Sequence, residues 1–189
     1  MKCLFIILTV LQSLFAALEQ KTLVSDFAIT ISDNPSPAAN NQPITYTGEL
    51  SMHGKQFMLE MFGIEAAYDG HTLYMYSEDT EELTLSIPTE EELVQTNPFL
   101  YAQALLPACQ YAEKVTGNTT EITLTPKDPA AGISKFVLQI TTTTLLPSLL
   151  EIHETGNKTT TLLLSNAVYT EAKPAFIIEK EGVFVNDLR

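Results

Sequence analysis

The sequence predicts a mainly β fold with one helical insertion, and three observations lead to this prediction. Most of residues 18–189 alternate between apolar and polar side chains with the period of two that is typical of strands. An Asp-Gly pair at 69 and 70 joins two such runs, and helix-start signals interrupt the alternation near residues 89 and 97. Antiparallel strands that are apolar on one face form either a sandwich or a curved, barrel-like sheet.

The alternating runs define the expected strands in chain order. In each run the apolar side chains fall on one face, and mostly Thr, Ser, Asp or Glu occupy the other. The apolar members are Phe27, Ile29 and Ile31; Ile44, Tyr46, Leu50 and Met52; Phe57, Leu59 and Met61; Leu73 and Met75; Leu83, Leu85 and Ile87; Ile122 and Leu124; Phe136, Leu138 and Ile140; and Leu162 and Leu164. No linker or repeat divides them, so residues 18–189 are expected to form a single domain.

The segment Tyr68-Asp69-Gly70-His71 is a strong hairpin signal between two of these strands. A two-residue type I′ turn needs positive φ at both central residues, and Asp followed by Gly suits it. We therefore expect the strands on either side of this pair to be antiparallel neighbours.

One stretch, residues 89–106, departs from the alternation and is expected to be helical. Thr89 and Glu92 have the spacing of a capping box, and Asn97 followed by Pro98 gives a second start signal. From Phe99 to Leu106 the stretch is strongly apolar, and Pro107 ends it. Two roles stay open for it: a plug that closes the end of the core, or a lid over a cavity.

Residues 1–17 are expected to be a signal peptide that is cleaved after Ala17, although a buried N-terminal helix is the alternative. Lys2 supplies a positive charge, an apolar run follows, and small residues close the segment. The run is shorter than the roughly 20 residues that span a bilayer. No Cys lies at the cleavage position, so the mature chain is expected to be soluble, with Cys109 as a buried, unpaired thiol.

Charge and motif content argue against several function classes. The chain has 10 Lys plus Arg against 23 Asp plus Glu, a net charge of −13, so nucleic-acid binding is not expected. The histidines His53, His71 and His153 stand alone, so no metal site is expected. The sequence has no nucleophile elbow, phosphate-binding glycine loop or Cys-x-x-Cys motif. We therefore expect a protein that is not an enzyme and that uses no cofactor.

Several short motifs follow one another along the mature chain. They are Tyr68-Asp69-Gly70-His71-Thr72-Leu73, Glu82-Leu83-Thr84-Leu85, Asn97-Pro98-Phe99-Leu100, Leu124-Thr125-Pro126-Lys127, Leu146-Pro147, Leu150-Glu151-Ile152, Phe176 and Val185-Asn186-Asp187-Leu188-Arg189. This ordered set resembles the LolA-like family of periplasmic outer-membrane lipoprotein carriers, and the hairpin resembles that of its Bacteroidetes-type branch.

The resemblance implies a half-open antiparallel β-barrel with a short helical lid inserted mid-chain. It also implies a monomeric periplasmic carrier that takes acylated lipoproteins from an inner-membrane ABC lipoprotein-releasing complex to an outer-membrane acceptor. Acyl chains need such shielding, because each CH₂ group removed from water is worth about 0.8 kcal/mol. Two alternatives are a LolA-like fold that binds another lipid or hydrophobic ligand, and a structural envelope protein with a filled core.

The apolar strand faces and the lid are expected to line a lipid-binding cavity. The expected lining residues are Phe27, Ile29, Leu50, Phe57, Leu59, Leu73, Leu83, Leu85, Phe99, Leu100, Leu105, Leu138 and Ile140. The resemblance also implies a helix before the first strand and a gating arginine. Here only residues 18–22 are expected before that strand, and Gly54 and Lys55 stand in the place of the arginine. We therefore expect no side-chain latch between this turn and the lid.

Overall fold

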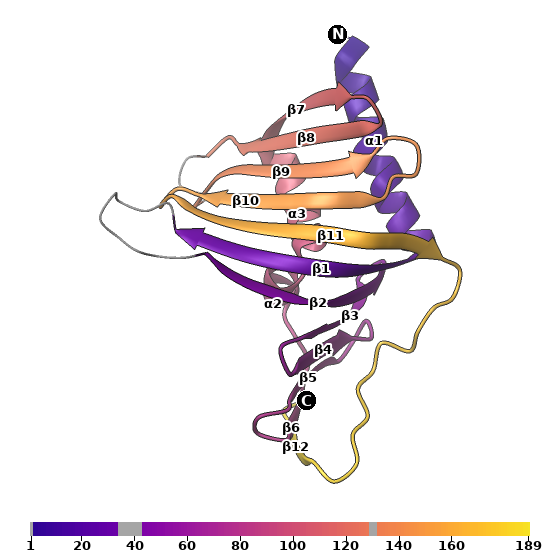
Figure 1. Ribbon diagram of the computed structural model, residues 1–189, viewed down its shortest axis with the longest axis vertical. Coiled ribbons are helices and arrows are strands. Elements are labelled where there is room, and N and C mark those ends of the chain that lie inside the picture. Colours follow the sequence, from indigo (N-terminus) through magenta and orange to yellow (C-terminus); the bar gives the residue numbers. More distant parts are fainter. Residues whose placement is uncertain (1, 34–42, 129–131) are drawn as a thin grey trace.

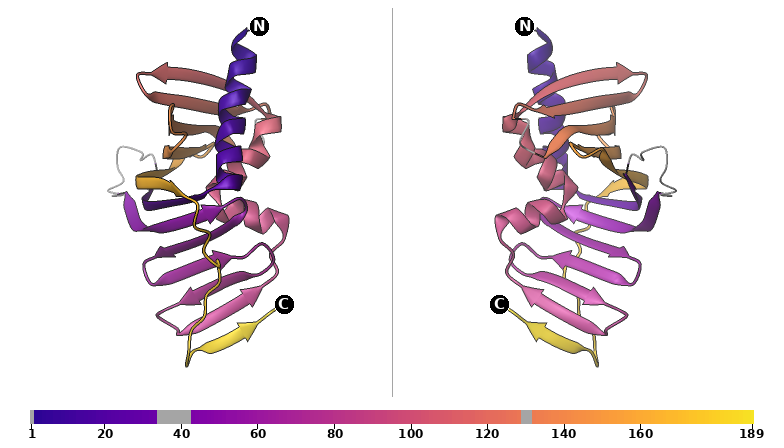
Figure 2. Two further views of the ribbon diagram at one scale, coloured as in Figure 1. Left: turned by 90° about the vertical axis from the view of Figure 1, so that its right-hand side faces the viewer. Right: turned by 90° about the vertical axis from the view of Figure 1, so that its left-hand side faces the viewer.

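A computed structural model describes residues 2–33, 43–128 and 132–189 and shows one curled sheet with helices on one side (Figures 1 and 2). Its strands are β1 (Thr22–Asp33), β2 (Ile44–His53), β3 (Gln56–Met61), β4 (Ile64–Tyr68), β5 (Leu73–Ser77), β6 (Glu82–Ser86), β7 (Cys109–Thr116), β8 (Thr119–Pro126), β9 (Ile133–Thr141), β10 (Pro147–Glu154), β11 (Lys158–Thr170) and β12 (Phe184–Asp187). The helices are α1 (Lys2–Gln20), α2 (Glu90–Thr96) and α3 (Pro98–Leu105), and a 3₁₀ turn η1 (Leu106–Ala108) follows α3.

The described strands form a single sheet in the order β12-β6-β5-β4-β3-β2-β1-β11-β10-β9-β8-β7. Neighbouring strands are antiparallel, except that β12 runs parallel to β6. Within the described residues β7 and β12 do not pair with each other, so the sheet curls without closing. The mainly β, half-open barrel with a helical insertion is therefore confirmed, and the sandwich alternative is not.

The described helices all lie against one face of the sheet (Figure 2). Residues that pair directly in an antiparallel ladder share a face, so the pairs Leu150–Leu162 and Leu162–Ile29 place three side chains together. The main buried cluster contains these residues, together with Leu14 of α1 and Phe99 of α3. We call the helix-covered side the inner face and the opposite side the outer face.

Local capping explains why the insertion forms two helices. The Oγ1 atom of Thr89 accepts a hydrogen bond from the Glu92 amide at 3.2 Å, and the Glu92 carboxylate accepts one from the Thr89 amide at 2.7 Å. Asn97 ends α2 and caps α3, with Pro98 in the first turn of α3. The capping box and the second start signal predicted from the sequence are both confirmed.

The hairpin expected around Asp69 and Gly70 is also confirmed, because β4 and β5 pair antiparallel on either side of it. The turn is longer than the two-residue turn that we expected. Asp69 Oδ1 accepts hydrogen bonds from the amides of His71 and Thr72, each at 2.8 Å. Of residues 69–72, only Gly70 has a positive φ, +104°. The Asp69 side chain therefore bridges a four-residue connection.

Leu83 and Leu85 lie on the outer face, so the expectation that they line an inner cavity is wrong. The β5–β6 register pairs the inner-face residue Leu73 with Ser86, which turns the adjacent Leu85 outward. Both leucines pack with Ile178 in a second buried cluster. Alternation shows that one face of a strand is apolar, but it does not show which side of the sheet that face meets.

The C-terminal segment covers this second cluster. After β11 the chain runs along the sheet toward the end formed by β5 and β6, and it brings β12 beside β6 (Figure 1). Lys180 Nζ lies 2.5 Å from Glu65 Oε1 and 4.6 Å from the centre of the Tyr76 ring. These contacts, together with buried Ile178, hold the segment against the outer face.

Helix α1 packs against the inner face, whereas the sequence led us to expect only residues 18–22 before the first strand. Leu14 is fully buried, and Leu11 and Leu18 are nearly so. The expected cleavage after Ala17 falls within this helix and stays a prediction. Among the described residues, no helix combines the length and the apolar character needed to cross a membrane.

Candidate functional site

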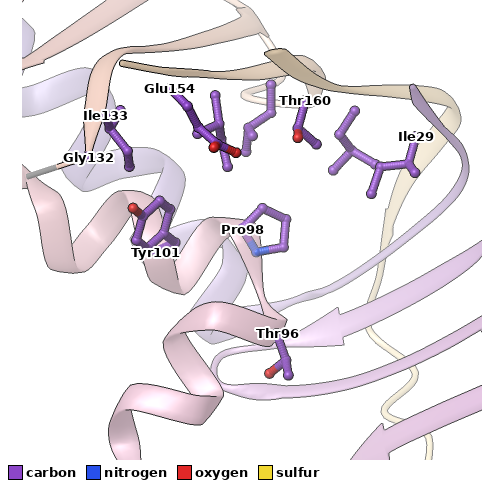
Figure 3. A pocket seen from close by; sticks show the side chains of 11 residues that line it. Ile29, Thr96, Pro98, Tyr101, Gly132, Ile133, Glu154 and Thr160 are labelled. Atoms are coloured by element: carbon purple, nitrogen blue, oxygen red, sulfur yellow. The ribbon is translucent and has the colours of Figure 1, made fainter. Parts of the chain in front are cut away.

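A cavity of about 480 Å³ opens between the inner face and the junction of α2 and α3 (Figure 3). Its volume lies within the range of roughly 300–1,000 Å³ that is usual for small-molecule sites. It is lined by Ile29 of β1, Thr96 of α2, Pro98 and Tyr101 of α3, Gly132 and Ile133 at the start of β9, Leu150, Ile152 and Glu154 of β10, and Thr160 and Leu162 of β11.

Strand alternation and register build the wall of the cavity that the sheet supplies. Leu150, Ile152 and Glu154 occupy every second position of β10 and so project to the same side. In the β10–β11 ladder Leu150 pairs with Leu162, and Ile152 pairs with Thr160. The wall is therefore aliphatic in the interior and becomes polar toward the end of β10.

The Asn97 cap builds the wall that the helices supply. Asn97 is buried, and its Oδ1 atom accepts hydrogen bonds from the amides of Phe99 at 2.9 Å and Leu100 at 3.3 Å. This fixes the first turn of α3, which carries Pro98 and leads to Tyr101. In Figure 3 Pro98 and Tyr101 face the strand residues across the cavity.

One ion pair marks the polar part of the cavity. Glu154 Oε1 lies 3.3 Å from Lys158 Nζ, and both side chains are partly exposed. Figure 3 shows Glu154 and Thr160 pointing into the cavity from the strands. Burial raises the pKa of Tyr101, and the negative charge of Glu154 raises it further, so the phenol stays protonated and can donate a hydrogen bond.

The lining offers little chemistry beyond apolar contact and hydrogen bonding. Among the described lining residues there is no His, Cys, Ser, Lys or Arg. Acid–base or nucleophilic catalysis normally relies on an activated base or nucleophile, and Glu154 is instead paired with Lys158. No group of three or more His, Cys, Asp or Glu side chains in the described part of the chain could hold a metal ion.

Most of the residues expected to line a cavity lie on the inner face but serve as packed core. The expected lining residues that belong to the main buried cluster or pack at its margin are Phe27, Ile29, Leu50, Phe57, Leu59, Leu73, Phe99, Leu105, Leu138 and Ile140. Of these only Ile29 lines the cavity. Phe57, Phe99, Leu138 and Ile140 are at most 2% exposed. Lipid contact by the predicted residues therefore stays a prediction.

The sequence analysis missed most of the residues that do line the cavity. Leu150, Ile152 and Leu162 belong to runs whose alternation or motif was recognised, but they were not proposed as lining. No local signal separates an inward residue covered by α1 or α3 from one left uncovered. That difference depends on where the helices rest.

A smaller cavity of about 280 Å³ separates the β2–β3 turn from the lid helices, and Lys55, Glu90 and Leu100 are among its lining residues. In the described part of the chain Lys55 forms no hydrogen bond or ion pair with α2 or α3. The turn is held by α1 instead, because the Gly54 amide donates a hydrogen bond to the Leu18 carbonyl oxygen at 2.6 Å. The absence of a functional latch at Lys55 stays a prediction.

Comparison with known proteins finds similarity at the level of the fold. No family model matches the sequence, and no curated protein sequence matches it. An uncharacterized conserved protein from Thermus thermophilus has 10% sequence identity and a TM-score of 0.60, over 93% of this chain and 98% of that chain. A chain of the MucA/MucB complex of Pseudomonas aeruginosa has 16% identity and a TM-score of 0.50, over 88% of this chain and 57% of that chain.

A LolA superfamily protein from Nitrosomonas europaea has 10% identity and a TM-score of 0.43, over 90% of this chain and 97% of that chain. At such identities the likeness concerns the fold alone. The open, curled sheet with helices against its inner face is the half-open β-barrel that the resemblance in the sequence implied.

Proposed function

We propose that this chain is a non-enzymatic periplasmic carrier that shields the acyl chains of lipoproteins and moves them from the inner to the outer membrane. The observation that carries the proposal is the unfilled cavity between the inner face and the lid helices. Its interior is lined by the aliphatic side chains Ile29, Ile133, Leu150, Ile152 and Leu162. Such a lining suits a flexible hydrocarbon chain, because apolar contact is non-directional.

The polar groups at the cavity support a carrier rather than an enzyme. Tyr101, Thr96 and Thr160 offer hydroxyl groups, and the Glu154–Lys158 pair offers compensated charge. These groups can orient the polar end of an acylated molecule at the mouth. None is arranged as the base–nucleophile pair that covalent catalysis uses.

Release of cargo requires a lid that is held weakly. The lid helices are short, and their described contacts with the β2–β3 turn include no ion pair. Burial of Phe99 and Leu100 therefore supplies the main attraction, worth roughly 1.5–3 kcal/mol for each fully buried side chain. An acyl chain that replaces such contacts can open the lid at small net cost.

Partners follow from the same proposal. The carrier would receive lipoproteins from an inner-membrane ABC lipoprotein-releasing complex and deliver them to an outer-membrane acceptor. Another lipid of similar shape would fit the same aliphatic lining, so ligand identification decides between the two cargoes. A structural protein with a filled core is disfavoured by the open volume beside Ile152 and Leu162.

Binding of a synthetic diacylated lipopeptide, compared with the same peptide without acyl chains, tests the proposal. Ile152→Trp would fill the cavity, and Leu163→Trp, at an exposed outer-face position, is the matched control. We expect wild type and the control to bind the acylated peptide and not the peptide without acyl chains. Ile152→Trp should bind the acylated peptide at least about tenfold more weakly, since several CH₂ groups lose their contacts. Equal affinity for both peptides, or no effect of Ile152→Trp in a folded protein, contradicts the proposal.

A further inference from the structure

Glu154 is the only charged side chain among the described residues that line the cavity. It ends β10, two positions beyond Ile152 on the same side of the strand, which is roughly 7 Å along it. A register shift after His153 places Glu154 opposite Ile133, another lining residue. The carboxylate therefore projects into the cavity at the point where the aliphatic wall ends (Figure 3).

The side chains around Glu154 leave this end of the cavity negative. Tyr101 and Thr160 contribute hydroxyl groups, which are neutral. Burial and, after it, the negative charge of Glu154 raise the pKa of Tyr101, so the carboxylate acts on this phenol across the cavity. The chain as a whole has a net charge of −13. A ligand that carries a positive charge at its polar end is therefore attracted to this part of the lining.

Lys158 is the cation that the structure places beside Glu154, and it is held there weakly. Its Nζ atom lies 3.3 Å from Glu154 Oε1, and the two side chains are 43% and 40% exposed. An exposed ion pair of this kind contributes little to stability. Lys158 is also not one of the described lining residues. A cation that enters the cavity with a ligand can therefore displace Lys158 at small cost.

We propose that Glu154 binds a primary ammonium group at the polar end of an acylated molecule, so that the carrier prefers cargo with a free amine to cargo whose amine is acylated. The inference rests on the proposed carrier function and names the feature by which the cavity selects its cargo. Hydrocarbon packed against Ile152 and Leu162 leaves its polar end beside Glu154. An ammonium group has three donors, which match the carboxylate and the hydroxyl oxygens of Tyr101 and Thr160.

Acylation of the amine removes this recognition, because an amide is neutral and keeps a single N–H donor. Two kinds of acylated molecule carry the required ammonium group. One is a peptide whose diacylated N-terminal cysteine keeps a free α-amine, and the other is a phospholipid with an ethanolamine headgroup. Comparing each of them with its own N-acetyl form separates recognition of the ammonium group from packing of the acyl chains.

Binding is measured by isothermal titration calorimetry at neutral pH with two pairs of short-chain probes that are monomeric in water. One pair is a diacylated lipopeptide and its N-acetyl form, and the other is phosphatidylethanolamine and its N-acetyl form. Glu154→Gln keeps the size of the side chain and removes its charge. Glu151→Gln is the matched control, since Glu151 lies between the inward residues Leu150 and Ile152 and so faces outward. Both variants have the same net charge, so a difference between them reports where the charge lies.

We expect wild type and Glu151→Gln to bind the free-amine member of at least one pair about fivefold more tightly than its N-acetyl form. This preference lies between the effects of an exposed ion pair and of a buried charge-assisted hydrogen bond. Glu154→Gln should bind both members of that pair equally, with its affinity for the N-acetyl form unchanged. Lys158→Gln should increase the preference by about twofold, because it removes the competing cation. The pair that shows the preference identifies the source of the ammonium group.

Equal affinity of wild type for both members of both pairs overturns the proposal and leaves the carrier function untouched. This comparison uses the unaltered protein, so it does not depend on how a variant folds. An undiminished preference in Glu154→Gln overturns the proposal as well. So does an equal loss of preference in Glu151→Gln, because net charge would then explain the effect. If wild type binds none of the four probes, the carrier function itself fails.

Discussion

The ring of Phe27 occupies the space that a side chain at Gly48 would need. The two residues pair directly in the β1–β2 ladder. A Cβ atom placed on Gly48 would lie 2.8 Å from Phe27 Cζ and 2.0 Å from the Glu60 carbonyl oxygen. The glycine therefore lets β1, β2 and β3 approach closely under a large aromatic ring, which shapes the inner face next to Ile29.

Gly48→Ala should destabilise the fold, because the backbone oxygen of Glu60 cannot move aside as a flexible side chain would. We expect a loss of about 1–3 kcal/mol in the free energy of unfolding, the usual range for overpacking a core. Urea denaturation followed by circular dichroism measures it. Gly156→Ala is the control, since no atom lies within 4 Å of its Cβ position, and it should change stability by less than about 0.5 kcal/mol. Equal effects at the two sites would show that space at Gly48 is not limiting.

Asn97→Ala should weaken both the fold and the binding of a diacylated lipopeptide. It removes the side chain that caps α3 and so should cost about 1 kcal/mol of stability. Binding should weaken as well, because Pro98 and Tyr101 of the same helix line the cavity. Thr89→Ala removes the cap at the start of α2, and the residue of α2 that lines the cavity, Thr96, lies at the other end of that helix. This variant should therefore lower stability alone. An equal loss of affinity in the two variants would contradict the role assigned to the α3 cap.

Local signals predicted the parts of the fold that depend on neighbours in sequence. The Thr89–Glu92 capping box and the Asn97-Pro98 start signal give both lid helices, because caps act within one turn. Asp69-Gly70 gave the hairpin but not its length, since the Asp69 side chain accepts two backbone hydrogen bonds that a two-residue turn lacks. The ordered motifs implied a half-open β-barrel, and the sheet is open in this way.

The parts that depend on distant neighbours were not predictable. Leu85 alternates as Leu138 does, yet the β5–β6 register and the C-terminal segment place it on the outer face. Leu138 and Ile152 are both inward residues of adjacent strands, but only Ile152 is left beside open volume. Whether an inward side chain is packed or lies beside open volume depends on where α1 and α3 pack. The spacing of residues in the strands does not predict it.

High pH should unfold the protein partly through Tyr169. Burial raises the pKa of this phenol from 10.0 to about 12, and its hydroxyl donates a hydrogen bond to the Leu145 carbonyl oxygen at 2.9 Å. Because the pKa of Tyr169 is higher in the folded state than in the unfolded state, the stability that the protonated phenol contributes is complete below pH 10. This stability is lost as pH rises toward 12. Tyr169→Phe should therefore lose less stability over this window than wild type does. Parallel stability curves for the two proteins would show that the Tyr169 phenol is not the group responsible.

Export should change the inner face. If cleavage occurs after Ala17, Leu11 and Leu14 leave the main buried cluster and Leu18 stays. We expect the protein recovered from periplasm to begin within two residues of Leu18, and to bind an apolar fluorescent probe more strongly than the uncleaved chain does. Intact mass spectrometry gives the first result and fluorescence titration the second. A periplasmic form that retains Lys2, or an acylated membrane-bound form, would refute the signal-peptide prediction.

Native mass spectrometry of the protein purified from periplasm without detergent tests the carrier account most directly. The account predicts that wild type and Leu163→Trp carry added mass that dissociates as an acylated molecule, and that Ile152→Trp carries little or none. Fragmentation of the released molecule then distinguishes a lipopeptide from a free lipid. A wild-type protein without bound acyl chains, or the same ligand occupancy in Ile152→Trp as in Leu163→Trp, would contradict the claim that this cavity holds the cargo.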